Sequence, residues 1–193
     1  MQKFNASTPV RHGLAARIVG RPLFWIAFVG VLFGVPLVRG LRNPKGPPPP
    51  PVMGAFPAFA LRDDRAEPFG TEQLAGHAFI ANLLCVHCPV EGALAAEQMR
   101  TLQHRARNLG DALLLVSFSP DGDSAALTAI RKQKPSSHRW TLLAGAPEQV
   151  RALFPGQKGL VLVDARFRIR GRYEPSEIDR ALRDASLMLD DSK

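Results

Sequence analysis

The chain has 193 residues, of which 46% are hydrophobic and 22% charged, which allows one folded domain of ordinary size and an additional segment. Its net charge of +8 is unevenly distributed: residues 1–53 carry seven of the 25 basic residues and no acid, and residues 54–193 carry 18 basic and 17 acidic residues. Because the folded part is nearly neutral, we expect no nucleic-acid partner. Two cysteines cannot build a disulfide scaffold or a four-cysteine zinc site.

The segment 22–38 contains no charged residue over its 17 positions and is flanked by Arg21 and Arg39. A membrane-spanning helix needs about 20 apolar residues, with about 17 as the lower limit. A cleaved signal peptide would have a shorter apolar region followed by small residues, and the sequence RGLRNPKG does not fit that pattern. We therefore expect a transmembrane anchor at 22–38 in a bacterial inner membrane or its equivalent. The tail 1–21 is expected in the cytoplasm and the C-terminal domain in the periplasm or another extracytoplasmic space.

Prolines are concentrated after this apolar segment, because seven of the chain's 17 lie between Pro44 and Pro57. A proline run adopts the extended polyproline II conformation and acts as a semi-rigid spacer. We expect residues 39–57 to be a linker that holds the domain away from the membrane. A ligand for a proline-binding domain is the alternative.

From residue 58 to residue 193, short apolar runs typical of strands alternate with segments of helical pattern. We expect strands at 58–64, 66–70, 78–84, 112–119, 139–145, 159–164 and 168–174, of which the first two and the last two form pairs. We expect helices at 71–76, 89–109, 123–134, 147–154 and 176–189, with Thr71 and Ser176 as caps, Pro89 and Pro147 in first turns and Gly110 as a stop. This order predicts an α/β domain with a mixed sheet covered by helices on both faces.

Both cysteines lie in the stretch NLLCVHCPVE, as Cys85 and Cys88. A Cys-x-x-Cys that ends the first central strand and opens a helix is the thioredoxin-like arrangement. The thiolate is the reactive form of cysteine, and the partial positive charge and free amides of a helix N-terminus stabilise it. We predict that Cys85 is the accessible, attacking thiol and that Cys88, in the first turn, is the more buried, resolving thiol.

His87 lies between the two cysteines. When protonated it would favour the Cys85 thiolate and move the pair towards the oxidising end of the scale; a solvated bystander is the alternative. Two thiolates and an imidazole would also suit Cu(I), so a copper site with Cys85 and Cys88 as ligands stays open. Two inert core cysteines are less well supported, because both fall in one motif at a strand-to-helix junction.

Three further stretches resemble the SCO/SenC family of membrane-anchored, thioredoxin-fold proteins. VSFSPDGDSAALTAI is similar to the family's strand, Asp-Pro-x-x-Asp-Thr turn and helix, WTLLAGAPEQVRAL to its Leu-Thr-Gly-x-Pro-Glu segment, and GLVLVDARFRIRGRY to its late hairpin. The resemblance covers residues 54–189 together with the anchor architecture. It implies a domain outside the cytoplasmic membrane and a role in assembling the copper centre of cytochrome c oxidase, through copper carriage, thiol–disulfide exchange or both.

The chain departs from the family pattern in two ways. The family usually separates its cysteines by three residues, whereas two separate Cys85 and Cys88. The family also supplies a histidine ligand eight residues before the Asp of its late strand, and that position, counted back from Asp164, is Gly156. No histidine follows His138, which could substitute only if its loop reached the cysteines.

The first of three hypotheses is a membrane-anchored SCO/SenC-like thiol:disulfide oxidoreductase with Cys85, Cys88 and His87 as catalytic residues. It needs no cofactor, and its partners would be the bilayer and a cysteine pair in the copper-site subunit of the oxidase or in an assembly factor. The second is a copper(I) metallochaperone in which Cys85, Cys88 and a nonstandard third ligand bind copper. The third is a non-catalytic tethered module.

Overall fold

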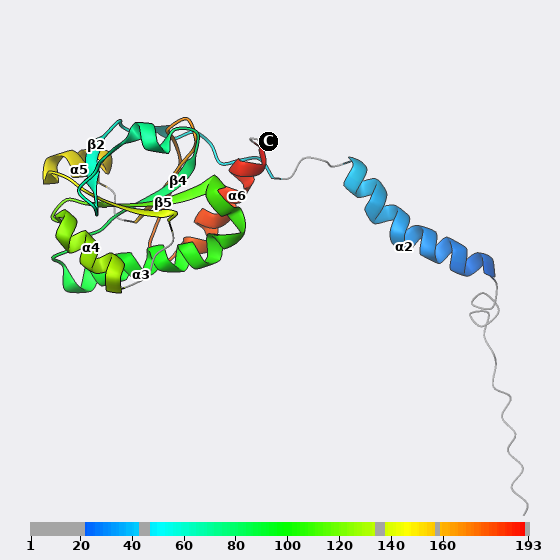
Figure 1. Cartoon of the computed structure of the whole chain (residues 1–193). Coiled ribbons are helices and arrows are strands. Elements are labelled where there is room, and N and C mark those ends of the chain that lie inside the picture. The colour runs from blue at the N-terminus through cyan, green and yellow to red at the C-terminus, as the bar shows by residue number, and fades with distance from the viewer. Residues whose placement is uncertain (1–21, 43–46, 134–137, 157–158, 192–193) are drawn as a thin grey trace, which may run out of the picture. The chain divides into compact units, whose positions relative to one another are not determined.

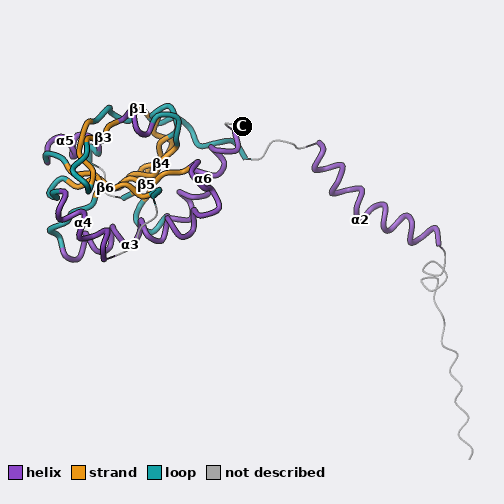
Figure 2. The backbone as a smooth tube through the Cα atoms, in the orientation of Figure 1, coloured by secondary structure: helices purple, strands orange, loops and turns teal. Residues whose placement is uncertain are grey.

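The computed structural model describes four stretches of the chain, 22–42, 47–133, 138–156 and 159–191 (Figures 1 and 2). The chain divides into two compact units, Met1–Gly46 and Pro47–Lys193. In the first unit, helix α2 spans Pro22–Arg42. Its exposed large apolar side chains are Leu23, Trp25, Ile26, Phe28, Val29, Val31, Leu32, Phe33, Val35, Leu37 and Val38.

None of the helices in the described stretches combines the length and the apolarity that crossing a bilayer requires. The segment 22–38, expected to be helical, does lie within the helix Pro22–Arg42. Its function as a transmembrane anchor stays a prediction. The expected tail at 1–21 lies outside the described residues. The placement of either unit in a cell compartment also stays a prediction.

The second unit contains an eight-stranded sheet among its described residues, in the order β1-β8-β7-β4-β5-β6-β2-β3. Strands β4, β5 and β6 run parallel, and the other neighbouring strands are antiparallel. The strands are β1 (Gly54–Ala55), β2 (Ala60–Asp63), β3 (Pro68–Gly70), β4 (Ala78–Leu83), β5 (Leu113–Ser119), β6 (Trp140–Ala144), β7 (Leu160–Val163) and β8 (Arg168–Tyr173). The helices are η1 (Thr71–Leu74), α3 (Pro89–Arg105), η2 (Ala106–Ala112), α4 (Ser124–Gln133), α5 (Pro147–Leu153) and α6 (Ile178–Asp191), where η marks a 3-10 helix.

The mixed sheet with helices on both faces is confirmed (Figure 1). Successive side chains of a strand point to opposite faces, so alternating apolar residues feed two separate cores. In β5, Leu113 and Leu115 pack with residues of α3, α4 and α6. Val116 and Phe118 pack on the other face with α5, η1 and several phenylalanines. The continuous apolar run of β5 therefore reflects burial on both faces, as expected for a central strand.

Some boundaries differ from the sequence-based prediction. Helix α3 ends at Arg105, and the chain continues as the 3-10 helix η2, in which Gly110 has φ 56° and ψ −144°. Thr71 begins η1 rather than capping it, because its hydroxyl exchanges hydrogen bonds with the backbone of Phe59. Helix α6 begins at Ile178, two residues after the expected cap at Ser176.

The C-terminal half of the proline-rich segment lies against the sheet. The amide of Met53 donates to the carbonyl of Ile169 at 2.8 Å, and the Arg170 side chain donates to the carbonyl of Pro50 at 2.8 Å. Strand β1, which the sequence did not predict, then pairs with β8. These contacts attach residues 50–55 to the edge of the second unit.

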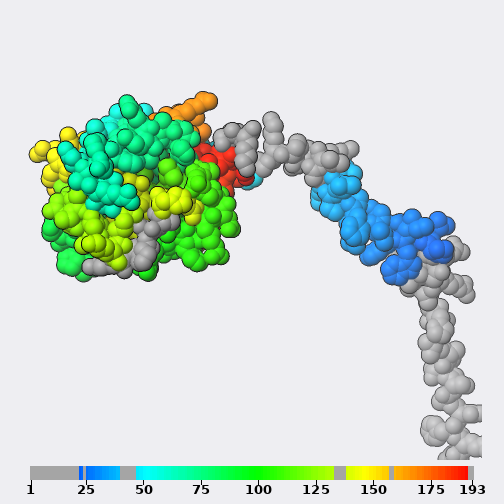
Figure 3. Space-filling view, in the orientation of Figure 1, coloured from blue at the N-terminus to red at the C-terminus, as the bar shows by residue number. Residues whose placement is uncertain are grey.

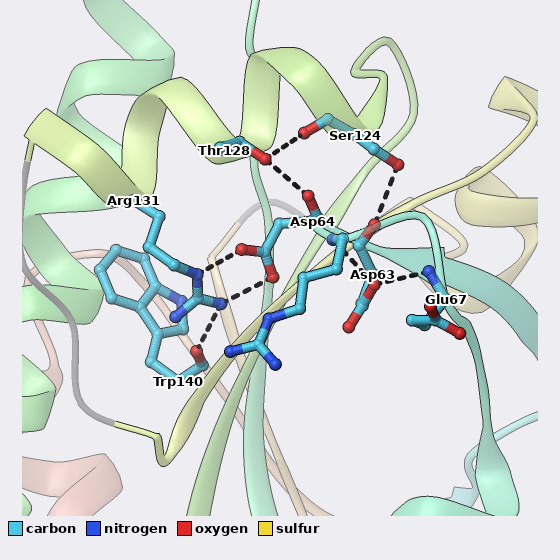
Figure 4. A network of polar contacts seen from close by, with 8 residues as sticks. Asp63, Asp64, Glu67, Ser124, Thr128, Arg131 and Trp140 are labelled. Atoms are coloured by element: carbon cyan, nitrogen blue, oxygen red, sulfur yellow. Dashed lines mark hydrogen bonds and ion pairs between the residues drawn. The ribbon is translucent and has the colours of Figure 1, made fainter.

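The β2–β3 hairpin is joined to α4 by polar contacts (Figure 4). The buried Asp64 carboxylate accepts hydrogen bonds from the Arg131 guanidinium, and the hydroxyls of Ser124 and Thr128 donate to the carbonyls of Asp63 and Asp64. The hairpin and α4 adjoin on the face shown in Figure 3. These contacts fix the start of α4, and with it the loop between β5 and α4.

Candidate functional site

The two cysteines lie at the junction between β4 and α3 and form a disulfide, with their Cα atoms 5.3 Å apart. Strand β4 ends at Leu83, so Cys85 follows the carboxyl end of a central strand. Cys88 is the N-cap of α3, one position before the first turn in which the sequence placed it. Both cysteines are half-buried.

Gly92 allows the first turn of α3 to pack directly on Cys85. A Cβ atom at this position would lie 2.0 Å from the Cys85 carbonyl oxygen, which is far closer than any van der Waals contact. The Gly92 amide also donates to the Cys88 carbonyl at 2.8 Å. The absence of a side chain here therefore sets the distance between the helix and the disulfide.

Asp121, in the loop after β5, lies beside the disulfide. Its Oδ2 is 3.1 Å from Cys85 Sγ and accepts the His87 amide at 3.0 Å. Its Oδ1 accepts the Val86 amide and the Ser119 hydroxyl, each at 3.0 Å. The carboxylate thus joins the backbone of the Cys-x-x-Cys loop to the end of β5.

Burial of Asp121 disfavours its charged form, but the hydrogen bonds outweigh this effect. The amides of His87 and Val86, the Ser119 hydroxyl and the His87 ring together hold the pKa of Asp121 below its ordinary value of 3.8. The carboxylate is therefore ionised at neutral pH. A fixed negative charge next to Cys85 opposes the formation of a thiolate there, which is the reverse of the effect expected from His87.

His87 interacts with this carboxylate. Its Nδ1 lies 3.4 Å from Asp121 Oδ2, and 71% of its side chain is exposed to solvent. A protonated His87 would offset part of the Asp121 charge, so its influence on Cys85 passes through Asp121. Its role as a tuning residue stays a prediction.

The structure separates His138 from the cysteines. His138 precedes β6, which begins at Trp140. Its Nε2 lies 3.0 Å from Asp111 Oδ1. Cys85 follows the last residue of β4, and β4, β5 and β6 run parallel. His138 and Cys85 therefore lie at opposite ends of the sheet. The two ends are separated by the length of β5, and its rise per residue makes that distance more than about 15 Å.

The loop before β7 does lie at the disulfide end, because β7 runs antiparallel to β4. Gly156, where the resemblance would place a histidine, is exposed and has φ 65°. Gly159, closer to β7, lines a pocket of about 360 Å³ that Cys85 also lines. In the described part of this loop, no side chain supplies a nitrogen ligand.

Two hollows flank the disulfide. The larger, of about 360 Å³, is mostly apolar and contains Cys85, Leu94, Pro120 and Pro175 together with the acidic Glu91. The smaller, of about 180 Å³, contains Cys85 and Cys88. Cys85 lines both hollows. Its role as the attacking thiol stays a prediction.

The donor atoms near the disulfide only partly fit copper(I). Among the described residues, Cys85, Cys88 and Asp121 offer ligand atoms that all lie within 4.8 Å of one another. Two thiolates suit Cu(I), whereas a carboxylate is a hard ligand that suits other cations. Among the described residues, the third ligand atom grouped with the two sulfurs is therefore the Asp121 carboxylate oxygen rather than a sulfur or an imidazole nitrogen.

The sequence analysis gave Asp121 no role, although this residue lies in the stretch VSFSPDGDSAALTAI. The signal that could have identified it is positional. Asp121 lies two residues after Ser119, the last residue of β5, and β5 is the parallel neighbour of the strand that leads to Cys85. Loops at the carboxyl ends of adjacent parallel strands meet at one edge of a sheet.

No protein-family model matches the sequence, and none of the curated proteins does. Solved structures match the fold. A SCO1/SenC family lipoprotein from Bacillus anthracis str. Ames has a TM-score of 0.62 at 21% identity, and the match covers 70% of this chain and 95% of that one. BsSco, a member of the Sco family of cytochrome c oxidase assembly proteins for which a disulfide switch is described, has a TM-score of 0.63 at 17% identity, covering 74% and 98%.

The copper-bound ScoI of Arabidopsis thaliana is also similar, with a TM-score of 0.58 at 16% identity over 73% of this chain and 99% of that one. At these identities the matches establish the fold. The thioredoxin-like fold of SCO/SenC proteins, expected from the sequence, is thus confirmed for this chain.

Proposed function

We propose that this chain is a thiol:disulfide oxidoreductase of the SCO/SenC type. The observation that carries the proposal is the Cys85–Cys88 disulfide, placed at a strand-to-helix junction with Cys85 open to pockets on two sides. An inert pair would be expected inside one of the two cores, whereas these cysteines are half-buried at the edge of the sheet. The fold shared with SCO/SenC structures supports the same assignment.

The exchange uses both sulfurs. A thiolate of the partner attacks Cys85 Sγ, a mixed disulfide forms, and Cys88 leaves as a thiolate that takes up a proton. The second thiolate of the partner then attacks its own sulfur in the mixed disulfide and releases Cys85. The partner is oxidised by two electrons, and this chain is reduced to the dithiol.

We propose a cysteine pair in the copper-site subunit of cytochrome c oxidase, or in one of its assembly factors, as the substrate. The support is the similarity to a member of a family of cytochrome c oxidase assembly proteins. An extracytoplasmic location is part of this proposal, because disulfides persist in oxidising compartments. Helix α2, with its exposed apolar side chains, is proposed as the membrane attachment.

The test is an exchange assay with a cysteine-pair peptide, comparing the wild-type chain with Cys85→Ser and Cys88→Ser. We expect Cys85→Ser to abolish exchange. With the peptide supplied as its disulfide, which runs the same exchange in reverse, Cys88→Ser should accumulate a mixed disulfide between Cys85 and the peptide, because the Cys88 thiol that would release the peptide is missing. Exchange that is unchanged in Cys85→Ser would refute the proposal.

Copper carriage is the second candidate function. It is favoured by the two cysteine sulfurs, which are soft ligands in one site, and by the similarity to a copper-bound ScoI. Anaerobic titration of the reduced chain with Cu(I) distinguishes it, since a carrier would bind one ion per chain tightly.

A further inference from the structure

Asp121 adds a third group of metal-ligating type to the two cysteines. Its carboxylate and the two sulfurs lie within 4.8 Å of one another, and Oδ2 approaches Cys85 Sγ to 3.1 Å. The two residues between Cys85 and Cys88 give the spacing found in many zinc sites. The groups come from two different loops, the junction of β4 with α3 and the loop after β5.

The Asp121 carboxylate is held in place before any cation arrives. Oδ1 accepts two hydrogen bonds, from the Val86 amide and the Ser119 hydroxyl. Oδ2 accepts the His87 amide and faces Cys85 Sγ. Gly122 permits this loop conformation, since a Cβ there would lie 2.5 Å from Ser119 Oγ and 2.8 Å from Val86 Cγ2. A ligand that is already positioned loses little conformational freedom on binding.

Reduction changes the electrostatics of this cluster. A disulfide sulfur carries no charge, and the Asp121 carboxylate is then the one negative group among the three. When both thiols ionise, three negative charges lie in contact, and each disfavours the others. A cation between them removes that repulsion, so cation binding and reduction favour each other.

We propose that the reduced chain binds a thiophilic divalent cation of the Zn²⁺ class through Cys85, Cys88 and Asp121, and that the disulfide form does not. This inference rests on the proposed exchange function, which supplies the reduced state. A dithiol partner transfers two electrons and two protons to the Cys85–Cys88 bond and becomes a disulfide. The cation then replaces the two thiol protons, which pass to solvent.

The Asp121 carboxylate adds a ligand that suits a divalent cation better than Cu(I). Zn²⁺ accepts sulfur and carboxylate oxygen ligands in one tetrahedral site, whereas Cu(I) gains most from soft ligands. Two thiolates and one carboxylate carry three negative charges, which a divalent ion neutralises further than a monovalent one. Three protein ligands leave the fourth position to water or to a ligand from a partner, which is typical of exchangeable rather than structural sites.

The test uses the purified full-length chain, reduced and metal-free under anaerobic conditions, with Zn²⁺ alone as the probe and a chromophoric chelator as competitor. We expect one Zn²⁺ per reduced chain and none on the oxidised chain. Asp121→Asn should weaken Zn²⁺ binding at least about tenfold, since loss even of an outer-sphere partner costs about that much. Cu(I) affinity should change less than about threefold. Asp111→Asn, at the other end of the sheet, is the matched control.

Equal Zn²⁺ affinities in the wild type and Asp121→Asn would overturn the proposal, as would equal binding by the oxidised chain. If Asp121→Asn does not fold, Asp121→Cys provides a second test with Co²⁺. A third thiolate in the site should raise the sulfur-to-cobalt absorption by about half, in proportion to the thiolate number. No increase would contradict the assignment.

Metal-free exchange, measured in parallel on the wild type, separates the two ideas. Exchange without Zn²⁺ binding would remove this inference and leave the proposed function. Zn²⁺ binding without exchange would refute the proposed function and leave the cation site.

Discussion

Cys85 lies beside a carboxylate rather than beside a positive charge, and this changes the expected chemistry of the Cys-x-x-Cys pair. The sequence analysis assigned the tuning of Cys85 to the helix N-terminus and to His87. In the structure the His87 ring contacts Asp121, and Asp121 contacts Cys85. The reactivity of Cys85 therefore depends on the balance between Asp121 and the N-terminus of α3.

A first prediction concerns this balance. In the reduced chain, Asp121 accepts a hydrogen bond from the Cys85 thiol and repels its thiolate, so both effects favour the unreactive form. We expect Asp121→Asn to raise the alkylation rate of Cys85 at neutral pH about three- to tenfold, equivalent to about 1 kcal/mol. The measurement is iodoacetamide labelling of the metal-free chain, with Asp111→Asn as the control. A rate that falls or does not change would contradict this reading of the site.

Asp121 was missed because its contact with Cys85 joins positions 36 residues apart. Local pattern identifies a strand end and a helix start, but which loops meet depends on the pairing of strands. Sequence placed Cys88 in the first turn of the helix, one position from its observed place as N-cap. This was possible because Pro89 has no amide to donate and is well suited to the first helical position. The separation of His138 from the cysteines, in contrast, required the parallel register of β4, β5 and β6.

At the scale of elements, the central strands could be predicted because they are continuous apolar runs, as in Leu113–Ser119. The late hairpin, Leu160–Val163 and Arg168–Tyr173, was also predictable from its alternation and turn. The short strand β1 was not, because two exposed residues carry no apolar pattern and pair only through the edge of β8. The close approach of Gly92 to the Cys85 carbonyl was not predictable either, because it also depends on how backbone segments pack against each other.

Gly92 provides a prediction about the junction of β4 and α3. Adding a Cβ forces α3 away from the Cys85 carbonyl, because the gap of 2.0 Å involves backbone and cannot relax by a side-chain rotation. We expect Gly92→Ala to slow exchange at least about tenfold and to lower stability by about 1–3 kcal/mol. Exchange kinetics and urea unfolding measure the two effects, with His104→Ala, at an exposed position near the C-terminal end of α3, as the control. Wild-type exchange in Gly92→Ala would show that this packing is unimportant.

Asp164 holds the turn between β7 and β8. Its Oδ1 accepts the amides of Arg166 and Arg168, and its Oδ2 accepts the side chains of Arg168 and Arg170. Burial opposes ionisation, but these hydrogen bonds lower the pKa of Asp164 below 3.8. A lowered folded-state pKa gives stability that is present above about pH 4 and lost as pH falls below it.

We therefore expect Asp164→Asn to destabilise the chain by about 3 kcal/mol at pH 7, since it leaves two arginines without their carboxylate. The cost should shrink as pH falls below about 4, because the wild type then loses the same interaction. Urea unfolding at pH 7 and pH 3 tests both statements. A constant difference at the two pH values would mean that the Asp164 charge does not stabilise the turn.

At the scale of the whole molecule, the chain joins an apolar helix to a nearly neutral thioredoxin-like domain through a proline-rich segment. The C-terminal part of that segment, from Pro50 to Ala55, contacts β8 and belongs to the second unit. The fold could be predicted as thioredoxin-like because its strands and helices, apart from β1, have clear local patterns. The membrane anchor expected at 22–38 from its apolar pattern stays a prediction.

The attachment is open to a direct test. Because α2 exposes large apolar side chains along its length, we expect the full chain to remain with membranes after carbonate extraction at alkaline pH. A chain beginning at Pro47, the first residue of the second unit, should be recovered in the soluble fraction. Release of the full chain by carbonate would rule out an inserted helix and leave at most peripheral binding.

The proposed function depends on Cys85 and Cys88 forming a redox-active pair. The reduction potential of the full chain tests this claim most directly. The measurement is an equilibrium titration in dithiol–disulfide buffers, read by alkylation and mass. We predict one two-electron transition in which both cysteines become alkylated together, with a potential above about −300 mV, the range below which structural disulfides lie. A disulfide that stays intact to below about −300 mV would identify a structural bond and contradict the account.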